Sequence, residues 1–431
     1  MTRRVVVIGA GIVGAALAAE LAGRDGLAVT VLERGPHDRL LGSTGHAPGL
    51  VGLLGEAPVA TELARASADS YEQLVHGGTA GFDRGGGLEV ASTTAALADL
   101  ERRARLAHDA GLPARVLDAA QTVACAPQLV DPARCVGGVL HPHDGTARAG
   151  VITAALQERA TRAGARFRYD APVHAIDVKG GRVHAVHAAG EVFSADDVVI
   201  ACGIWGPAVA ALAGQALPLT PVQHPYLYGP PHGRSTASSP FVRWPEHHVY
   251  ARDHGDRLGI GTYDHTPRPV PAHQLGANAE QPWPAEVFDP AVAGALDLLP
   301  AGHRYAPEQR LNGVFSMTAD NLPLLGPLEA VEGLWAAEAL WVTHAAGAAR
   351  ILAQLMTGTA PTVAGLDALH PGRFTGRPAD ELTDFALALY RDIYRPPPTR
   401  PDDPSGYGEC SVRDSGTPIT GAGKATVDPA S

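Results

Sequence analysis

Two glycine-rich stretches near the N-terminus contain residue types that can bind a phosphate-bearing ligand. The first, GAGIVG at residues 9–14, lies between a β-branched run and a run of good helix formers. In such a turn Gly9 makes the tight bend, Gly11 lets a pyrophosphate approach the backbone, and Gly14 lets the helix pack on the strand. The free N–H groups of the helix N-terminus then face the phosphate. The pattern predicts a dinucleotide-binding turn.

A carboxylate follows at the spacing that this turn requires. Glu33 ends a second strand-like run, LAVTVLER, about 20 residues beyond the glycines, where it can hydrogen-bond a ribose. The strand, turn, helix, second strand and acid together favour dinucleotide binding over a glycine-rich turn that binds nothing. Glu33 suits FAD as well as NAD, so the motif alone leaves the dinucleotide open.

The second stretch, GSTGHAPGLVG at residues 42–52, places a single imidazole, His46, among small residues. Its glycines permit close approach of the backbone to a ligand. The hydroxyls of Ser43 and Thr44 can bond a phosphate or the edge of a ring. Because this loop follows the nucleotide signature so closely, we expect it to lie beside the cofactor.

The elements that must position these loops can be read from periodicity. Helical patterns occupy about 60–80 and 98–112, and a helix leading into a strand begins at 151. The apolar strand DDVVIACG runs into a Gly-Ile-Trp-Gly turn and can return the chain to the dinucleotide sheet. Near residue 333 a strand-like run precedes a strongly helical one that opens on Thr343. From 396 onward the chain is polar and rich in glycine and proline, which predicts a disordered tail.

Composition excludes several classes of function. The 431 residues carry a formal net charge of −11 without a basic stripe, so we expect no nucleic-acid partner. No run of about 18 apolar residues is present, so we expect no membrane span. The four cysteines are widely spaced, which fits reduced thiols in a cytoplasmic protein. His141 and His143 in HPHDG are only a weak metal pair, and we expect turn histidines and no metal site.

Spread along the chain are motifs that together resemble one family. They are GGGLEVAST, HPHDGTARAG, ACGIWGP, PLTPVQHPY, HGDRLGIGTYDH, NGVFSMTADNLPLLGP and EALWVTHAAGAARILAQLMTG, in addition to the two N-terminal loops. In this order they resemble the FAD-dependent amine oxidoreductases of the D-amino-acid-oxidase superfamily. Within it they are most similar to the dimethylglycine oxidase/dehydrogenase and sarcosine dehydrogenase branch. The resemblance covers about residues 3 to 375.

The resemblance implies a fold of the α/β (α+β) class. It is a Rossmann-type FAD-binding domain, glutathione-reductase-like, interleaved with an antiparallel-sheet substrate domain. The expected parts are the FAD-binding domain at 1–85, 141–215 and 306–395, the substrate domain at 86–140 and 216–305, and the tail at 396–431.

The resemblance also assigns roles to residues. In the similar enzymes the histidine of a GSTxHA loop is joined covalently to the flavin 8α carbon, which makes His46 the attachment site. A neutral imidazole nitrogen is a competent nucleophile, and the alternative is a histidine that only lines the flavin. His224 and Tyr250 become catalytic candidates, for proton transfer and for bonding the substrate carboxylate or a water chain. Structural roles are the alternatives. The cofactor-binding residues implied are Gly9, Gly11, Gly14, Glu33, Arg34, Ser43, Thr44, His46, Val173, Trp205, Gly326, Thr343 and Gly347.

The implied reaction is oxidation of a secondary or tertiary amine, such as dimethylglycine or sarcosine. Hydride passes to flavin N5, and hydrolysis of the iminium product releases formaldehyde. Oxygen or an electron-transfer partner reoxidises the flavin, and the only lysines are Lys179 and Lys424, so an oxygen-activating lysine at the ring is not expected. The rivals are a D-amino-acid or imino-acid dehydrogenase and an electron-passing flavoprotein subunit without its own substrate. Long members of the branch continue into a folate-binding region, and the chain stops where that region begins, so folate coupling is not expected.

Overall fold

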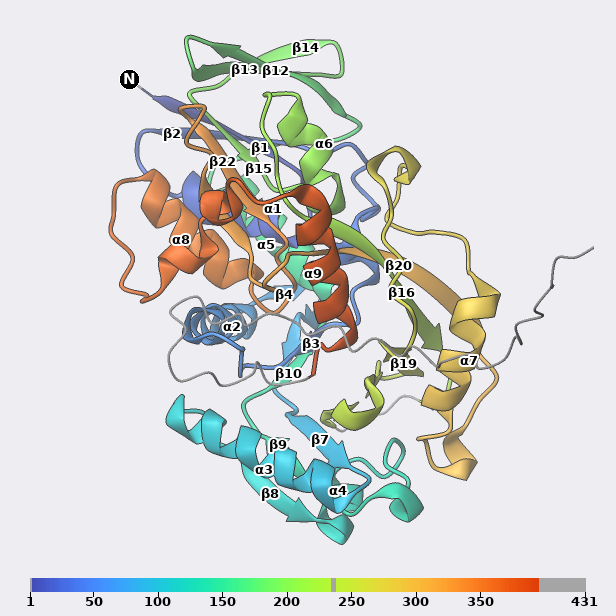
Figure 1. The fold of residues 1–431 in the computed structure, drawn as a ribbon. Helices are drawn as coiled ribbons and strands as arrows, with labels where there is room; N and C mark the ends of the chain where they lie inside the picture. The colour runs from blue at the N-terminus through green and yellow to red at the C-terminus, as the bar shows by residue number, and fades with distance from the viewer. Residues whose placement is uncertain (1, 234–237, 395–431) are drawn as a thin grey trace, which may run out of the picture. The chain divides into compact units, whose positions relative to one another are not determined.

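A six-stranded sheet carries the glycine-rich turn (Figure 1). The structure is a computed structural model that describes residues 2–233 and 238–394, so the tail predicted at 396–431 lies outside the described residues. The first five strands in the sheet are parallel and the last is antiparallel. In spatial order they are β11 (Arg166–Arg168), β2 (Leu27–Leu32), β1 (Arg3–Ile8), β15 (Asp197–Ile200), β22 (Leu334–Glu338) and β21 (Leu324–Pro327).

Both faces of this sheet are covered, which explains why β1 is an unbroken apolar run from Val5 to Ile8 rather than an alternating one. Val5 and Val7 join the core under the helices, whereas Val6 and Ile8 join the core on the opposite face. The helices on the first face are α1 (Ile12–Ala22), α5 (Ala149–Arg162) and α8 (Ala345–Met356), with α2 (Pro58–Tyr71) packed on α8. The second face carries α6 (Gly206–Ala211) and a meander of β12 (Val173–Lys179), β13 (Arg182–Ala188) and β14 (Glu191–Ser194).

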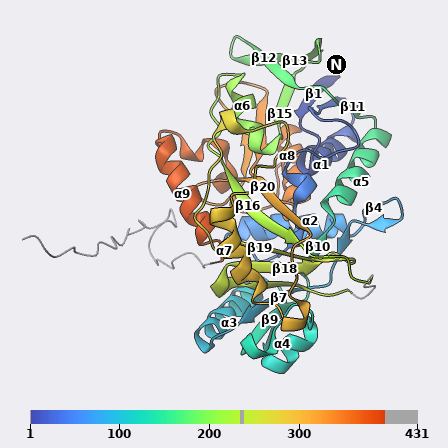
Figure 2. The ribbon, with the colours of Figure 1, turned by 90° about the vertical axis from the view of Figure 1, so that its right-hand side faces the viewer.

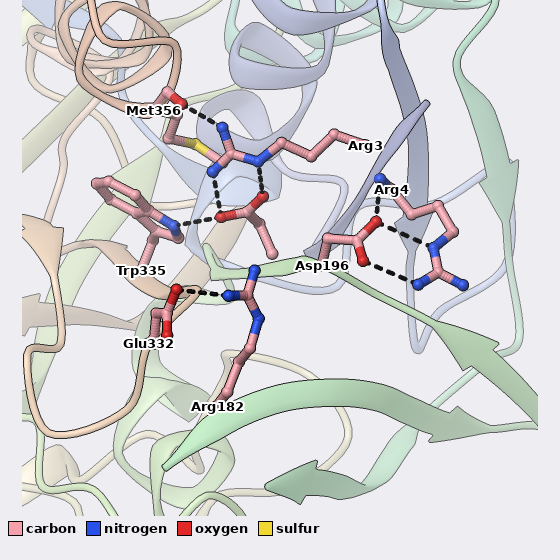
Figure 3. A network of polar contacts seen from close by, with 8 residues as sticks. Arg3, Arg4, Arg182, Asp196, Glu332, Trp335 and Met356 are labelled. Carbon is pink, nitrogen blue, oxygen red and sulfur yellow. Dashed lines mark hydrogen bonds and ion pairs between the residues drawn. The ribbon is translucent and has the colours of Figure 1, made fainter. Parts of the chain in front are cut away.

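Charged groups pair with one another where the parallel strands begin (Figure 3). The guanidinium of Arg3 bonds both carboxylate oxygens of Asp197 on the neighbouring strand, and the Trp335 indole N–H donates to Asp197 Oδ1 at 2.9 Å. Arg4 binds Asp196 at 2.8 Å in the same way. These ion pairs link neighbouring strands and stabilise their register. They lie at the end of the sheet opposite the glycine-rich turn, so they do not occupy the end where a ligand is expected.

The second large sheet has eight strands and is antiparallel except between β17 and β7. In spatial order its strands are β20 (Gln309–Met317), β16 (Thr220–Tyr228), β19 (Leu258–Thr262), β18 (Val249–Asp253), β17 (Phe241–Trp244), β7 (Gly87–Ala91), β9 (Gly137–His141) and β8 (Arg115–Asp118). Around it lie α3 (Thr94–Asp109), α4 (Ala119–Cys125), α7 (Ala285–Leu296) and α9 (Ala379–Arg391). Figures 1 and 2 both show α9 lying along β16 and β20.

The remaining short strands form two small sheets of their own. One three-stranded sheet comprises β3 (Leu50–Val51), β10 (Gly145–Ala147) and β6 (Phe82–Asp83), and a hairpin comprises β4 (Val75–His76) and β5 (Thr79–Ala80). Among the described residues no helix is long and apolar enough to cross a membrane.

The predicted strand, turn, helix and second strand at the N-terminus are confirmed as β1, α1 and β2. The predicted helix at 98–112 is found at 94–109. The helix expected to open on Thr343 begins at Ala345, with His344 before it, and α9 was not predicted. The boundaries of the domains stay predictions, although β20 belongs to the eight-stranded sheet while its residues fall in the part expected to bind FAD.

Candidate active site

The glycine-rich turn leaves no room for side chains at two of its predicted positions. Gly9 has a φ of +108°, and a Cβ there would overlap the Ala201 carbonyl at the end of the neighbouring strand. A Cβ on Gly14 would overlap the Gly9 carbonyl, since helix α1 lies directly against the turn. These contacts match the roles expected for the first and third glycines of a dinucleotide fingerprint.

Glu33 and Thr44 both reach this turn. The Glu33 carboxylate accepts hydrogen bonds from the N–H groups of Ala10 and Gly35, each at 2.8 Å. The Thr44 hydroxyl accepts from the Ile12 N–H at 3.2 Å, at the N-terminus of α1. The two glycine-rich stretches of the sequence are therefore side by side, and the 43–46 loop lies over the helix end that is expected to face phosphate.

An arginine and a tryptophan predicted to contact the cofactor are brought together. The Arg34 guanidinium lies 4.7 Å from the centre of the Trp205 ring, and the Trp205 indole N–H donates to the Gly276 carbonyl at 3.2 Å. The backbone of Gly42 adjoins the same ring. This cation–π pair therefore lies beside the second glycine-rich stretch, next to Glu33 in the sequence.

His46 ends a short 3₁₀ turn, Ser43–His46, that is tied to the eight-stranded sheet. The Ser43 hydroxyl donates to the Val314 carbonyl of β20 at 2.7 Å. The His46 ring occupies the space above Gly313, where a Cβ would lie 2.7 Å from Cδ2. Burial lowers the pKa of His46 to about 4, against a smaller opposing effect of a hydrogen bond with the Val314 backbone. The imidazole is therefore neutral at neutral pH and keeps a free lone pair.

His224 lies on the same face of the sheet as His46. It is paired directly with Gly313 in the β16–β20 register, and directly opposed residues of antiparallel strands share a face. Both ring nitrogens are bonded: Nε2 to the Tyr250 hydroxyl at 2.7 Å and Nδ1 to the Tyr390 hydroxyl at 2.6 Å. Burial holds the pKa of His224 well below its usual range, and the nearby His265 and His46 lower it further.

Tyr250 needs a glycine neighbour to reach His224. A Cβ on Gly261 of β19 would overlap the Tyr250 ring, so the ring lies flat across that strand. The Tyr250 and His224 rings are nearly parallel, with centres 5.7 Å apart and planes 9° apart. Burial raises the pKa of the Tyr250 phenol, so it remains protonated. The two catalytic candidates named from the sequence are thus in direct contact.

The rings of Tyr250, His224, Tyr390 and His265 form one hydrogen-bonded ring cluster. Sequence reasoning missed Tyr390 and His265, and also the neighbouring Arg243. Tyr390 on α9 is fully buried against His224, and His265 bonds the same hydroxyl at 2.8 Å. The apolar periodicity of 379–391 was the signal for Tyr390, but the motifs of the family end before it. Arg243 pairs with Tyr250 in the β17–β18 register and therefore shares its face. Within the described ranges, Arg243 Nε is buried and has no hydrogen-bond partner.

A buried acid lies at the end of the six-stranded sheet next to the glycine turn. Glu338 ends β22 and is 1% exposed, and its Oε1 accepts from the Cys202 N–H at 2.7 Å. Its Oε2 has no hydrogen-bond partner among the described residues. Burial raises the pKa of Glu338 to about 8. Hydrogen bonds with the backbone and thiol of Cys202 and with the backbone of Gly203 lower the pKa by less. The acid is mainly protonated at neutral pH.

The remaining predicted cofactor residues lie elsewhere or have packing partners. Val173 opens β12 and packs in the core of the meander face. A Cβ added at Gly326 would lie 3.3 Å from Cδ of Pro371. Gly347 packs against α2, because its N–H donates to Ser67 and a Cβ would overlap the backbone of Leu63. The Thr343 hydroxyl donates to the Leu50 carbonyl at 3.2 Å rather than capping α8. Their contacts with a cofactor stay predictions.

The HPHDG turn forms part of a buried charge cluster. His141 Nε2 lies 3.5 Å from a Glu89 carboxylate oxygen, and Arg103 bonds both oxygens of Glu89 at 3.1 Å. Within the described part of the chain, no group of three His, Cys, Asp or Glu side chains is arranged to hold a metal ion.

Comparison with known proteins identifies the family. A family model described as FAD dependent oxidoreductase (DAO) matches residues 4–355. The chain belongs to this family. The 4-methylaminobutanoate oxidase (formaldehyde-forming) of Paenarthrobacter nicotinovorans is 28% identical over 86% of this chain and 46% of its own length. Human mitochondrial sarcosine dehydrogenase is 28% identical over 78% of this chain and 37% of its own length. The chain spans about half the length of these relatives, or less.

The predicted fold class is confirmed by similarity to solved structures. The L-proline dehydrogenase of P. horikoshii superposes with a TM-score of 0.75 at 20% identity, covering 86% of this chain and 98% of that one. At this identity the match establishes the arrangement of the two sheets and not the substrate.

Proposed function

We propose that this chain binds FAD and oxidises a secondary or tertiary amine that carries both an N-methyl group and a carboxylate. The supporting comparisons are the relatives named for 4-methylaminobutanoate and sarcosine. The observation that carries the proposal is the buried His224, bonded at both ring nitrogens on the face that also receives His46. A family member that only passed electrons would not need a group for proton transfer beside the loop of residues 43–46.

The residues present fit the cofactor. The close backbone packing at Gly9 and Gly14 brings the helix N-terminus of α1 beside the Glu33 carboxylate, and this arrangement suits a pyrophosphate and a ribose. Glu338 adds a buried oxygen that has no hydrogen-bond partner among residues 2–233 and 238–394, at the carboxyl ends of the strands, where dinucleotides bind in such sheets. When bound, FAD supplies the two-electron oxidant that takes a hydride from the carbon beside the amine nitrogen.

His224 and Tyr250 would prepare the amine. An amine can lose hydride from its α-carbon only while its nitrogen has a free lone pair, so a bound ammonium must first lose a proton. His224 is neutral because burial lowers its pKa, and its Nε2 is hydrogen-bonded to the Tyr250 hydroxyl. The pair can therefore accept that proton. Hydrolysis of the resulting iminium product then releases formaldehyde and the demethylated amine.

Arg243 would bind the substrate carboxylate. Its guanidinium lies against Phe241 and Tyr394, at 4.9 and 5.8 Å from the ring centres. Because Arg243 shares the face of Tyr250 and its Nε lacks a partner within the described residues, an anion there would complete its hydrogen bonding. This position favours an N-methyl amino acid over a simple amine.

We further propose that His46 forms a covalent bond to the flavin. The support is its neutral imidazole, which is a better nucleophile than an imidazolium, and its fixed position over Gly313. Acid precipitation tests the bond: flavin should stay with the wild-type pellet and with the pellet of a control, His273→Ala, whose histidine is exposed. His46→Ala should release its flavin to the supernatant. Flavin that washes out of the wild-type pellet would leave His46 as a lining residue.

The substrate class is tested by mixing the holoenzyme, without oxygen, with sarcosine, dimethylglycine, 4-methylaminobutanoate and D-proline. We expect loss of the flavin absorbance band with at least one of the first three. Bleaching by D-proline alone would support the D-amino-acid or imino-acid dehydrogenase instead. Bleaching by none would support an electron-passing subunit. Repeating the mixing in air and with an artificial electron acceptor decides between oxygen and an electron-transfer partner.

A further inference from the structure

Four side chains form a continuous hydrogen-bonded row that leads away from the proposed substrate face. Tyr250 of β18 bonds His224 of β16 at 2.7 Å, and His224 bonds Tyr390 of α9 at 2.6 Å. Tyr390 bonds His265, which follows β19, at 2.8 Å. The row joins two strands and the loop after β19 to a helix that lies outside the matched residues 4–355.

The direction of these hydrogen bonds follows from one backbone carbonyl. The Thr266 carbonyl can only accept, so His265 donates to it from Nδ1 at 3.0 Å. In neutral His265, Nε2 then accepts from the Tyr390 hydroxyl. Tyr390 in turn accepts from Nδ1 of His224, which leaves Nε2 of His224 to accept from Tyr250. In this arrangement every hydroxyl and imidazole in the row donates toward His265, and the Gln223 carbonyl is the alternative acceptor for the Tyr390 hydroxyl.

Tyr390 has a second acceptor that lets the row change state. Its hydroxyl also lies 3.1 Å from the Gln223 carbonyl. When His265 is doubly protonated, it donates to Tyr390 from Nε2, and the Tyr390 proton can turn to Gln223. A phenol oxygen accommodates one donated and two accepted hydrogen bonds, and these three neighbours fill that capacity.

His265 is the most exposed member of the row. Tyr250 and His224 are 4% and 7% exposed and Tyr390 is fully buried, whereas His265 is only half-buried. A proton that enters at Tyr250 therefore reaches a group that can exchange it with water.

Resting on the proposed amine oxidation, we propose that Tyr250, His224, Tyr390 and His265 form a proton relay that carries the ammonium proton of the substrate to solvent. The substrate N–H proton passes to the Tyr250 oxygen as the Tyr250 proton moves to His224 Nε2. The Nδ1 proton of His224 moves to Tyr390, and the Tyr390 proton moves to Nε2 of His265. His265 then releases one proton to water, so one proton enters and one leaves without any change in electrons. Tyr390 and His265 act through His224 and are positioning residues.

The charges around the relay oppose retention of the proton. His46 and Tyr263 lie near His224, and Arg243 lies near Tyr263. Burial has the largest effect on the pKa of His265, and it lowers that pKa. The Thr266 carbonyl and Asp264 raise it, and Arg268 and Arg391 lower it. A proton that reaches His265 is therefore released at neutral pH rather than stored.

Tyr390→Phe tests the relay by removing one hydroxyl. The matched control is Tyr305→Phe, because the Tyr305 hydroxyl is buried and has no hydrogen-bond partner within the described residues. With dimethylglycine as the probe, anaerobic flavin reduction by Tyr390→Phe should slow roughly 10- to 100-fold at pH 7. It should return toward the wild-type rate at alkaline pH, where the amine is already deprotonated in solution. An equal loss at every pH, or no loss, would overturn the relay.

His265→Ala gives a second test at the outer end. Free imidazole in the buffer should restore its rate of flavin reduction, whereas the exposed-site control His273→Ala should not respond to imidazole. No rescue of a slowed His265→Ala, or a rate that is not slowed, would count against the relay.

Nitrogen-15 NMR of the histidine rings in the resting holoenzyme provides a readout that needs no turnover. Both His224 and His265 should carry their proton on Nδ1, and an Nε2–H form of either ring at neutral pH would overturn the relay. If no amine reduces the wild-type flavin but the NMR result holds, then the proposed function fails and the hydrogen-bonded row stands.

Discussion

The glycine-rich turn of the six-stranded sheet and the ring cluster of the eight-stranded sheet differ in what specifies them. The turn depends on the lack of a side chain at Gly9 and Gly14, where backbone carbonyls lie too close for a Cβ, and on hydrogen bonds from nearby backbone groups and from Glu33 and Thr44. The ring cluster is specified by side chains from two strands, one helix and the loop after β19, which meet only in the folded chain. We infer that the first region holds the cofactor and that the second handles protons, so substitutions in the two should fail in different ways.

The largest effect is expected in the turn. Gly14→Ala places a Cβ on the Gly9 carbonyl and should destabilise the protein by about 3 kcal/mol or more, with loss of bound FAD. The FAD-to-protein absorbance ratio and the thermal midpoint measure both losses. Gly294→Ala is the control, because a Cβ there meets no atom within 4 Å. Full FAD content in Gly14→Ala would mean that the turn does not carry the dinucleotide.

The next effect separates the ring cluster from the turn. His224→Asn removes the proton acceptor beside Tyr250 while FAD remains bound, and flavin reduction by amine should slow on the order of 100-fold. Stopped-flow absorbance without oxygen measures the rate, and the yellow colour of the purified variant reports the cofactor. A variant that loses FAD instead would place His224 in cofactor binding and break the comparison.

A smaller effect is expected at the proposed carboxylate site. Arg243→Gln should raise KM for a carboxylate-bearing amine roughly 10- to 100-fold with little change in kcat, the signature of lost ground-state binding. Steady-state kinetics with dimethylglycine and with N,N-dimethylethanolamine, which lacks the carboxylate, supply the contrast. A KM that rises equally for the two amines would contradict a carboxylate partner.

The smallest effect concerns the acid beside the turn, and it depends on pH. The pKa of Glu338 is raised to about 8 in the folded protein, so its favourable contribution is complete below its unfolded pKa and is lost as pH rises toward 8. Glu338→Gln should therefore gain stability relative to wild type between pH 5 and pH 7, on the order of 2 kcal/mol. Urea unfolding at both pH values checks this gain. A difference between the two proteins that does not change with pH would mean that Glu338 does not titrate as a buried acid.

The turn could be predicted from the sequence because its signals are local. The spacing of Gly9, Gly11, Gly14 and Glu33 fits within two strands and one helix, and the structure has the same elements there. His46, His224 and Tyr250 were named through a family resemblance, and their meeting depends on Gly313 and Gly261, whose importance is visible only in the sheet register.

Other residues could not be predicted because their partners are remote in sequence. Tyr390 meets His224 across 166 residues from an amphipathic helix with no motif of its own. Arg243 looks like an ordinary strand residue until its buried Nε, which has no hydrogen-bond partner in the described part of the chain, is seen on the face of Tyr250. Gly347, predicted at the cofactor, packs closely on α2, since a small residue at a helix N-terminus serves helix packing equally well.

The central claim is oxidation of an N-methyl amine, and a single turnover tests it most directly. The holoenzyme is mixed without oxygen with excess dimethylglycine, sarcosine or 4-methylaminobutanoate, and formaldehyde is measured against the flavin bleached. We expect one formaldehyde per reduced flavin with at least one of these amines. Bleaching without formaldehyde, or no bleaching with any of them, would contradict the account.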